Sequence, residues 1–272
     1  MEKRKNKIFK NKYLLILIGI LLFAFVLRLI YFNIDQAEWW DAADYLQATK
    51  KFAGIAPYHG YEINPRRPFF MPLFWAGILK LGLGETGLRF SMLLFSMFGV
   101  WLTYLVGKEM YNKKVGLIAA FIMSVFWMHL FFTARLLLDL PATTIWSAAV
   151  YFFWRGYDKK EKAKYIWLTG LFIGIAVFTK ATSFLGVVIL FLFLLTTDKL
   201  RFLKNTNLWI AIVIALIVIS PFLIYVQSKT GDTFKKVTGI GEGRFVGGGH
   251  LKGFSGIMQY SKFFDDYLGW PF

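Results

Sequence analysis

Apolar residues in this chain gather into blocks separated by short polar stretches. The first block runs from Tyr13 to Phe32, and six more cover about 88–107, 115–132, 137–154, 165–179, 183–197 and 208–226. A helix needs about 20 apolar residues to cross the hydrocarbon core of a bilayer. The pattern therefore predicts an all-α protein, a polytopic membrane helix bundle with about seven spans.

The first block differs from a signal peptide, which has an apolar run of about 7–15 residues and a small-residue cleavage site. This block is longer and ends in Tyr31, Phe32 and Asn33. We predict a retained helix behind a basic cytoplasmic tail, residues 1–12. With the N-terminus inside, the Lys- and Arg-rich connections fall on the cytoplasmic side, as the positive-inside rule requires. These connections are residues 108–114, 155–164 and 198–207.

The first outer loop, residues 33–87, is too long to be a simple connector. It holds a predicted interfacial helix (39–52), a stretch rich in Pro, Gly and Tyr (56–68) and an apolar segment (69–83). That segment is short for a span, so we place it along the outer membrane surface. If it crossed the bilayer, every later loop would change side and the charge bias would invert.

A second outer region, residues 227–272, follows the transmembrane domain, residues 13–226. It is rich in glycine and aromatic residues, and we expect the chain to stop before a further span. Its Gly239–Gly243 motif has no strand before it and no capped helix after it, so a phosphate cradle is not expected there.

Composition supports this assignment. The chain is 57% hydrophobic and only 18% charged, whereas soluble domains carry about 25% charged residues. A formal net charge of +16 would indicate nucleic-acid binding in a soluble protein, but in a membrane protein it marks cytoplasmic loops. The absence of cysteine excludes disulfides and Cys-based metal sites.

Two acids follow the first span in the sequence WWDAADY. Asp41 and Asp44 are three residues apart and therefore share one helical face. For Asp44 we favour an N-cap or first-turn role. Asp41 is the better candidate for a catalytic base, because Trp39 and Trp40 precede it and would shield it from water.

Two arginines stand between prolines in the sequence NPRRP. Arg66 and Arg67 fit two functions: binding anionic lipid headgroups, or clamping a phosphate with the fork of the guanidinium. Arg28, near the outer end of the first span, either adds to such a clamp or extends to the interface.

Arg135 and Asp139 are four residues apart between two predicted spans. The simplest interpretation is a local ion pair that closes a tight turn. The competing interpretation is that Asp139 is a second acid beside Asp41. Elsewhere, only His59, in the same loop as Asp41 and Glu62, is a candidate metal ligand, and a lone His is usually structural.

The order of these segments resembles the GT-C membrane glycosyltransferases, in particular the dolichyl-phosphate-mannose protein mannosyltransferase and aminoarabinose transferase group. The resemblance spans about residues 13–226. It is carried by Leu27–Leu29, Trp40–Tyr45, Arg66–Pro68, Gly84–Arg89, Gly107–Tyr111, Lys114–Gly116, Thr133–Pro141 and Phe178–Lys180.

The resemblance implies transfer of a sugar, with inversion, from a polyprenyl-phosphate donor to a hydroxyl acceptor on the extracytoplasmic face. It implies that Asp41 is the catalytic base, and that Arg67, Arg28 and Lys180 stabilise the departing phosphate. Ala42 stands where relatives often have Glu. Arg66 stands where aminoarabinose transferases have a Glu that assists metal binding, so no metal site of that kind is expected.

We therefore predict a glycosyltransferase in a prokaryotic cell membrane that requires no cofactor, with a divalent cation left open. Its partners are a polyprenyl-phosphate sugar, a protein, lipid or glycan acceptor and membrane lipids, without nucleic acid. The alternative is a non-enzymatic membrane protein, a transporter or a lipid-binding assembly subunit. A transporter would bury ionisable residues in mid-span, whereas the polar residues here lie at outer helix ends.

Overall fold

The structure of the protein is a computed structural model that describes residues 12–32 and 39–232. Throughout these ranges the chain forms helices joined by loops and contains no strand. The predicted all-α membrane helix bundle is confirmed. The glycine motif at 239–243 and the aromatic end of the chain lie outside the described residues.

Each predicted span corresponds to one helix or to a broken pair. They are α2 (Lys12–Phe32), α5 (Gly84–Met110), α6 (Lys113–Val125) with α7 (Trp127–Phe131), α8 (Asp139–Phe153), α9 (Ala163–Thr179), α10 (Phe184–Asp198) and α11 (Thr206–Thr230). Among the described residues, α2, α5, α11 and α10 with its leading turn are long and apolar enough to cross a membrane.

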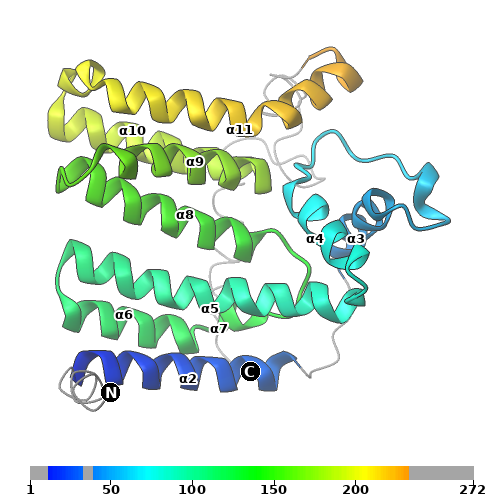
Figure 1. The fold of residues 1–272 in the computed structure, drawn as a ribbon, viewed down its shortest axis with the longest axis horizontal. Coiled ribbons are helices and arrows are strands. Elements are labelled where there is room, and N and C mark those ends of the chain that lie inside the picture. Colours follow the sequence, from blue (N-terminus) through cyan, green and yellow to red (C-terminus); the bar gives the residue numbers. More distant parts are fainter. Residues whose placement is uncertain (1–11, 33–38, 233–272) are drawn as a thin grey trace, which may run out of the picture.

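The long helices lie side by side with nearly parallel axes (Figure 1). Four pairs of helices make the main packing contacts: α5 with α6, α5 with α8, α8 with α9, and α9 with α11. Short connections close one end of the bundle, which we call the basic end. The helices α3 (Trp40–Ala53) and α4 (Phe70–Lys80) lie at the opposite end, which we call the α3–α4 end.

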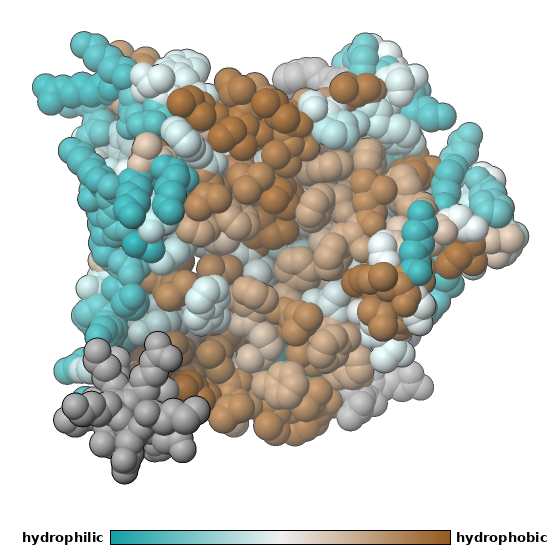
Figure 2. Space-filling model, viewed as in Figure 1, coloured by the Kyte–Doolittle hydropathy of each residue, from teal (hydrophilic) through white to brown (hydrophobic). Residues whose placement is uncertain are grey.

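The distribution of hydrophobic side chains on the surface is that expected of a protein embedded in a bilayer. Hydrophobic side chains form a broad band across the middle of the molecule, and hydrophilic side chains gather at both ends, mixed with hydrophobic patches at the right-hand end (Figure 2). Large apolar side chains such as Leu22, Ile189 and Ile217 are exposed on α2, α10 and α11. Apolar patches of this extent face lipid or another apolar surface. The chain is an integral membrane protein.

Helices approach closely where glycine removes the side chain. A Cβ built on Gly170 of α9 would lie 2.1 Å from the carbonyl oxygen of Ala211 in α11, and one on Gly174 would lie 2.8 Å from the Cβ of Val218. Small residues at such contacts bring helix backbones together, as is typical of membrane helices.

The two short helices anchor the α3–α4 end to the bundle. In α4, Met71 and Trp75 are fully buried, and the Trp75 indole donates to Ser91 Oγ of α5 at 3.0 Å. Gly54 caps the C-terminal end of α3, and its φ of +78° allows its N–H to reach the carbonyls of Lys50 and Lys51. The loop from Gly54 to Phe69 is therefore held at both ends.

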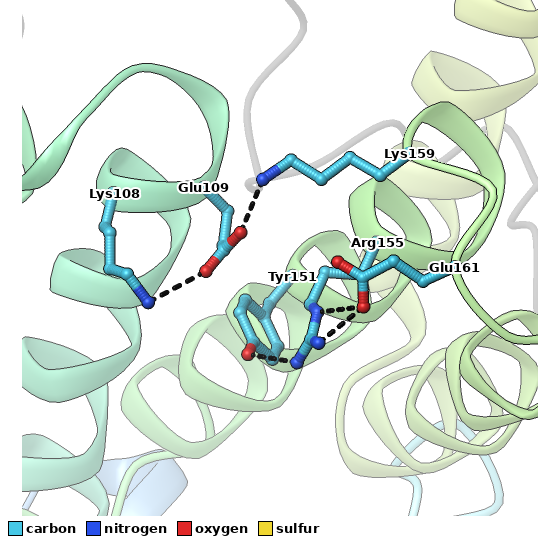
Figure 3. A network of polar contacts seen from close by, with 6 residues as sticks. All are labelled: Lys108, Glu109, Tyr151, Arg155, Lys159 and Glu161. Carbon is cyan, nitrogen blue, oxygen red and sulfur yellow. Dashed lines mark hydrogen bonds and ion pairs between the residues drawn. The ribbon is translucent and has the colours of Figure 1, made fainter.

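Charged side chains connect neighbouring segments at the basic end (Figure 3). Glu109 of α5 accepts from Lys108 at 3.0 Å and from Lys159 at 2.5 Å. Arg155, just beyond α8, pairs with Glu161 at 2.5 Å and donates to the Tyr151 hydroxyl at 2.8 Å. These contacts fasten the connection between α8 and α9 to the end of α5.

Candidate functional site

Arg67 joins the loop after α3 to α3 itself. Its Nη2 donates to Asp41 Oδ1 at 2.6 Å, and its Nε donates to Asp44 Oδ2 at 2.9 Å. Asp44 also accepts a hydrogen bond from the Tyr61 hydroxyl. One guanidinium therefore bridges the two carboxylates that the sequence placed on one face of α3. We call these four residues the Arg67 cluster.

A tight turn aims Arg67 at α3. The Arg67 N–H donates to the Asn64 carbonyl at 3.0 Å, and the Arg66 N–H donates to the Asn64 side chain at 3.0 Å. Between its two flanking prolines the chain has few backbone conformations. As a result Arg66 remains exposed, whereas the Arg67 guanidinium lies 5.1 Å from the centre of the Tyr45 ring.

One buried donor of the Arg67 cluster is available to a ligand. Arg67 Nη1 is buried and has no hydrogen-bond partner among the described residues. A buried donor without a partner costs about 1–3 kcal/mol, so a ligand acceptor that reaches it gains that much. The arrangement can therefore bind an anion while Asp44 fixes the guanidinium from the other side.

Two expectations about the acids of α3 are wrong. The tryptophans do not shield Asp41, because its side chain is 56% exposed and Trp40 is 93% exposed. Trp39 instead packs edge-on against Phe131. Asp44 is neither a helix cap nor a first-turn acid, because the N-cap of α3 is Trp39 and the acid of its first turn is Asp41.

Ala42, which replaces an expected second acid, faces away from the Arg67 cluster. It is 1% exposed and packs in a core cluster with Leu136 and Leu138. A carboxylate at this position would be buried among leucines, where its desolvation would be costly. Its absence therefore removes nothing from the face that carries Asp41.

Asp139 does not form the expected local pair with Arg135. Residues 135–138 are not helical, so the i, i+4 spacing does not bring the side chains together. Asp139 instead pairs with Lys180, which follows the last turn of α9. The Arg135 guanidinium donates to the Phe131 carbonyl at 3.0 Å and lies 3.7 Å from the centre of the Phe131 ring.

The Lys180–Asp139 pair borders a hollow of about 250 Å³ that Thr143, Trp146 and Ser183 also line. Tyr45 connects this region to the Arg67 cluster. Burial raises the pKa of Tyr45 to about 12, and the charges of Arg67, Asp41 and Asp139 all act on the same hydroxyl. Both ion pairs therefore belong to one electrostatic neighbourhood at the α3–α4 end.

Arg28 lies elsewhere, inside the bundle. It is fully buried, and its guanidinium donates to Ser96 Oγ at 2.6 Å, to the carbonyls of Ala24 and Ser124 and to His129 Nδ1 at 2.9 Å. Protein groups thus hold this side chain on several sides, and it neither reaches the interface nor joins Arg67. Its expected place in a phosphate clamp is wrong.

His59 and Glu62 are not brought together with the acids of α3. His59 Nε2 is 2.9 Å from the Gly54 carbonyl of its own loop, and Glu62 is exposed. Within the described ranges, no group of three or more His, Asp or Glu side chains is placed to hold a metal.

Sequence patterns did not indicate Tyr45, Tyr61 or His129. Tyr61 lies 17 residues from its partner Asp44, in a loop without periodicity. His129 appeared as an isolated His inside an apolar block. A charged arginine is costly inside a membrane unless it has a partner. Only the burial of Arg28 would therefore have indicated that His129 serves as such a partner.

Comparison with known proteins decides the family. A family model described as dolichyl-phosphate-mannose-protein mannosyltransferase matches residues 66–225, more than half of the chain. The chain belongs to this family. The match contains Arg67, Asp139 and Lys180, whereas Asp41 and α2 precede it. No curated protein sequence matches the chain.

A solved structure shares the fold of this mannosyltransferase-family chain. The crystal structure of ArnT from Cupriavidus metallidurans in the apo state superposes with a TM-score of 0.67 at 15% sequence identity. The alignment covers 81% of this chain and 43% of the ArnT chain. The resemblance predicted from sequence motifs is therefore confirmed in family and in fold.

Proposed function

We propose that this chain forms the donor-binding and catalytic part of a membrane glycosyltransferase. The enzyme takes a sugar from a polyprenyl-phosphate donor and passes it to a hydroxyl acceptor on the extracytoplasmic face. The observation that carries this proposal is the Arg67 cluster. There a cation whose buried donor has no partner among the described residues adjoins an exposed carboxylate.

The reaction breaks the bond between the anomeric carbon and the phosphate oxygen and forms a new glycosidic bond. In our proposal Asp41 accepts the proton of the acceptor hydroxyl as that oxygen attacks. Arg67 and Lys180 stabilise the negative charge that develops on the departing polyprenyl phosphate. Attack from the face opposite the phosphate inverts the anomeric carbon.

The ion pairs suggest how donor binding prepares the base. Asp41 shares Arg67 with Asp44, so a phosphate that binds at Nη1 competes with Asp41 for the same cation. Asp44, which is also held by Tyr61, keeps the guanidinium in place during this exchange. Asp41 is then released to accept a proton.

The location fits a lipid-linked substrate. The α3–α4 end borders the apolar band in Figure 2, so a polyprenyl tail can remain in the bilayer while its phosphate reaches Arg67. The hollow beside Lys180 and Asp139 provides a place for the sugar or for the acceptor. We assign no cofactor to the reaction.

The test is transfer of labelled sugar in membranes that contain the chain, using a panel of polyprenyl-phosphate sugars and, in parallel, any longer natural form. Product formation with release of polyprenyl phosphate supports the proposal and identifies the sugar. Failure of every donor in the longer form would overturn it in favour of a transporter or a lipid-binding subunit.

A further inference from the structure

A second hollow, of about 360 Å³, opens at the basic end, on the side of the molecule away from the proposed catalytic site. It lies where the start of α9, the end of α10 and the start of α11 meet. Three cations line it: Lys160, Lys162 and Arg201. Among the described residues, the side chains of these three cations have no hydrogen-bond or ion-pair partner.

Two nearby acids are already paired with other cations, and a third, Asp158, is exposed and does not line the hollow. Glu109 binds Lys108 and Lys159, and Glu161 binds Arg155, as Figure 3 shows. The hollow therefore keeps an excess of positive charge, although one acid does line it.

That acid is Asp198, which accepts a hydrogen bond from the Tyr157 hydroxyl. Burial, and then the hydrogen bond to Asp198, raise the pKa of Tyr157, so this hydroxyl remains a donor. With three cations against one such acid, the lining side chains favour an anion.

The backbone adds to this preference. Helix α9 begins at Ala163, its N-cap Lys162 makes no side-chain cap, and its first turn holds no acid. The first N–H groups of a helix carry a partial positive charge and bind anions. Ala163 itself lines the hollow.

Two exposed tryptophans near the hollow are typical of the depth of lipid headgroups. Trp167 donates to the Asn207 side chain at 3.1 Å, and Trp209 donates to the Leu203 carbonyl at 2.8 Å. These two residues are 40% and 51% exposed. Exposed tryptophans with a satisfied N–H mark the membrane–water interface. Apolar walls from Ile166 and Phe202 suit an acyl chain entering from the bilayer.

We propose that this hollow binds the phosphate of an anionic phospholipid headgroup. Lys160, Lys162 and Arg201 provide charge-assisted hydrogen bonds to the phosphate oxygens, and the start of α9 faces the same anion. A bound lipid of this kind joins the ends of α9, α10 and α11 to one leaflet. The site is independent of the proposed transfer reaction.

The test measures phosphatidylglycerol retained by the purified chain, using native mass spectrometry after extraction from bilayers of phosphatidylglycerol and phosphatidylcholine. One triple variant removes the lining charges: Lys160→Gln, Lys162→Gln and Arg201→Gln. A matched control removes three cations of the same end that do not line the hollow: Lys114→Gln, Lys164→Gln and Lys204→Gln. Thermal stability shows that each variant is folded.

We expect the lining variant to retain at least about tenfold less phosphatidylglycerol than the control, because charge-assisted contacts are lost in one variant only. Equal losses in both variants would indicate diffuse surface attraction and overturn the proposal, as would no loss in either. Binding of inorganic phosphate to a hollow that retains no phosphatidylglycerol would reassign the hollow to free phosphate and overturn the proposal. If the triple variant does not fold, Lys160→Gln against Lys204→Gln gives the same comparison.

Discussion

Arg67 and Arg28 carry the same charge in opposite surroundings. Arg67 lies in a partly exposed cluster with two acids, and one of its donors has no partner among the described residues. Arg28 is fully buried among neutral groups of α2, α5 and the α6–α7 pair. The sequence suggested one shared phosphate clamp for both. The structure gives them separate surroundings, from which we propose ligand binding for Arg67 and helix association for Arg28.

Substitution separates these tasks. We expect Arg67→Gln to weaken donor binding with little change in thermal stability, because its carboxylate partners are accessible to water. Arg28→Gln should lower stability instead, since each buried group left unsatisfied costs about 1–3 kcal/mol. Donor titration and thermal unfolding of both variants check this. Loss of donor binding in a fully stable Arg28→Gln protein would contradict it.

Tyr45 gives a prediction about pH. Burial raises its pKa from the ordinary value of about 10 to about 12, so the folded protein holds the proton more tightly than the unfolded chain. This contribution to folding is fully present below pH 10 and is lost as the pH rises through about 12. We expect the stability of the wild type, relative to Tyr45→Phe, to decline from about pH 10 upward. A difference independent of pH would exclude this cause.

Residue types could be predicted from sequence, but their partners could not. Asp41, Arg67, Asp139 and Lys180 were recognisable because charges near apolar helix ends are costly and require a reason. The pairing of Lys180 with Asp139 joins positions 41 residues apart. It depends on how α8 and α9 meet, which no local pattern encodes.

At the scale of elements, the length of the apolar blocks was sufficient to predict the helices, because the thickness of a bilayer sets the length of a spanning helix. The break between α6 and α7 was not predicted, since the run has neither Pro nor Gly there. Phe126 adopts an extended conformation, with φ −62° and ψ 114°. The break frees the Ser124 carbonyl, which Arg28 Nη1 then binds at 3.1 Å. A tertiary contact therefore replaces a helical hydrogen bond.

Gly170 tests helix packing. Gly170→Ala would place a methyl group 2.1 Å from a backbone oxygen of α11, so α9 and α11 must separate. Overpacking of this kind costs about 1–3 kcal/mol. Gly19→Ala in α2 is the matched control, because nothing lies within 4 Å of its new Cβ. Thermal unfolding should show a loss for Gly170→Ala only. Equal effects would mean that the α9–α11 contact contributes little.

At the scale of the whole molecule, we predict that the α3–α4 end faces outward and the basic end faces the cytoplasm. The chain contains no cysteine, so single introduced cysteines report accessibility without background. We expect Glu62→Cys, at the α3–α4 end, to react with an impermeant maleimide in intact cells. Lys204→Cys, at the basic end, should react only after permeabilisation. The reverse pattern would place the proposed site in the cytoplasm.

The molecule also spans only 43% of the ArnT chain whose fold it shares. The family match and the common fold include the elements that hold Arg67, Asp139 and Lys180. Acceptor recognition is the function that we least expect these elements to supply alone. For this reason the decisive measurement uses either this chain or a longer natural form, whichever transfers sugar.

That measurement is the transfer rate of Asp41→Asn beside Asp158→Asn, together with donor binding by both variants. Asp158 is an exposed acid at the basic end, so its substitution makes the same chemical change away from the site. Loss of a catalytic base costs about 100-fold or more. We predict such a loss for Asp41→Asn with donor binding retained, and an unchanged rate for Asp158→Asn. Full transfer by a folded Asp41→Asn protein would contradict the account.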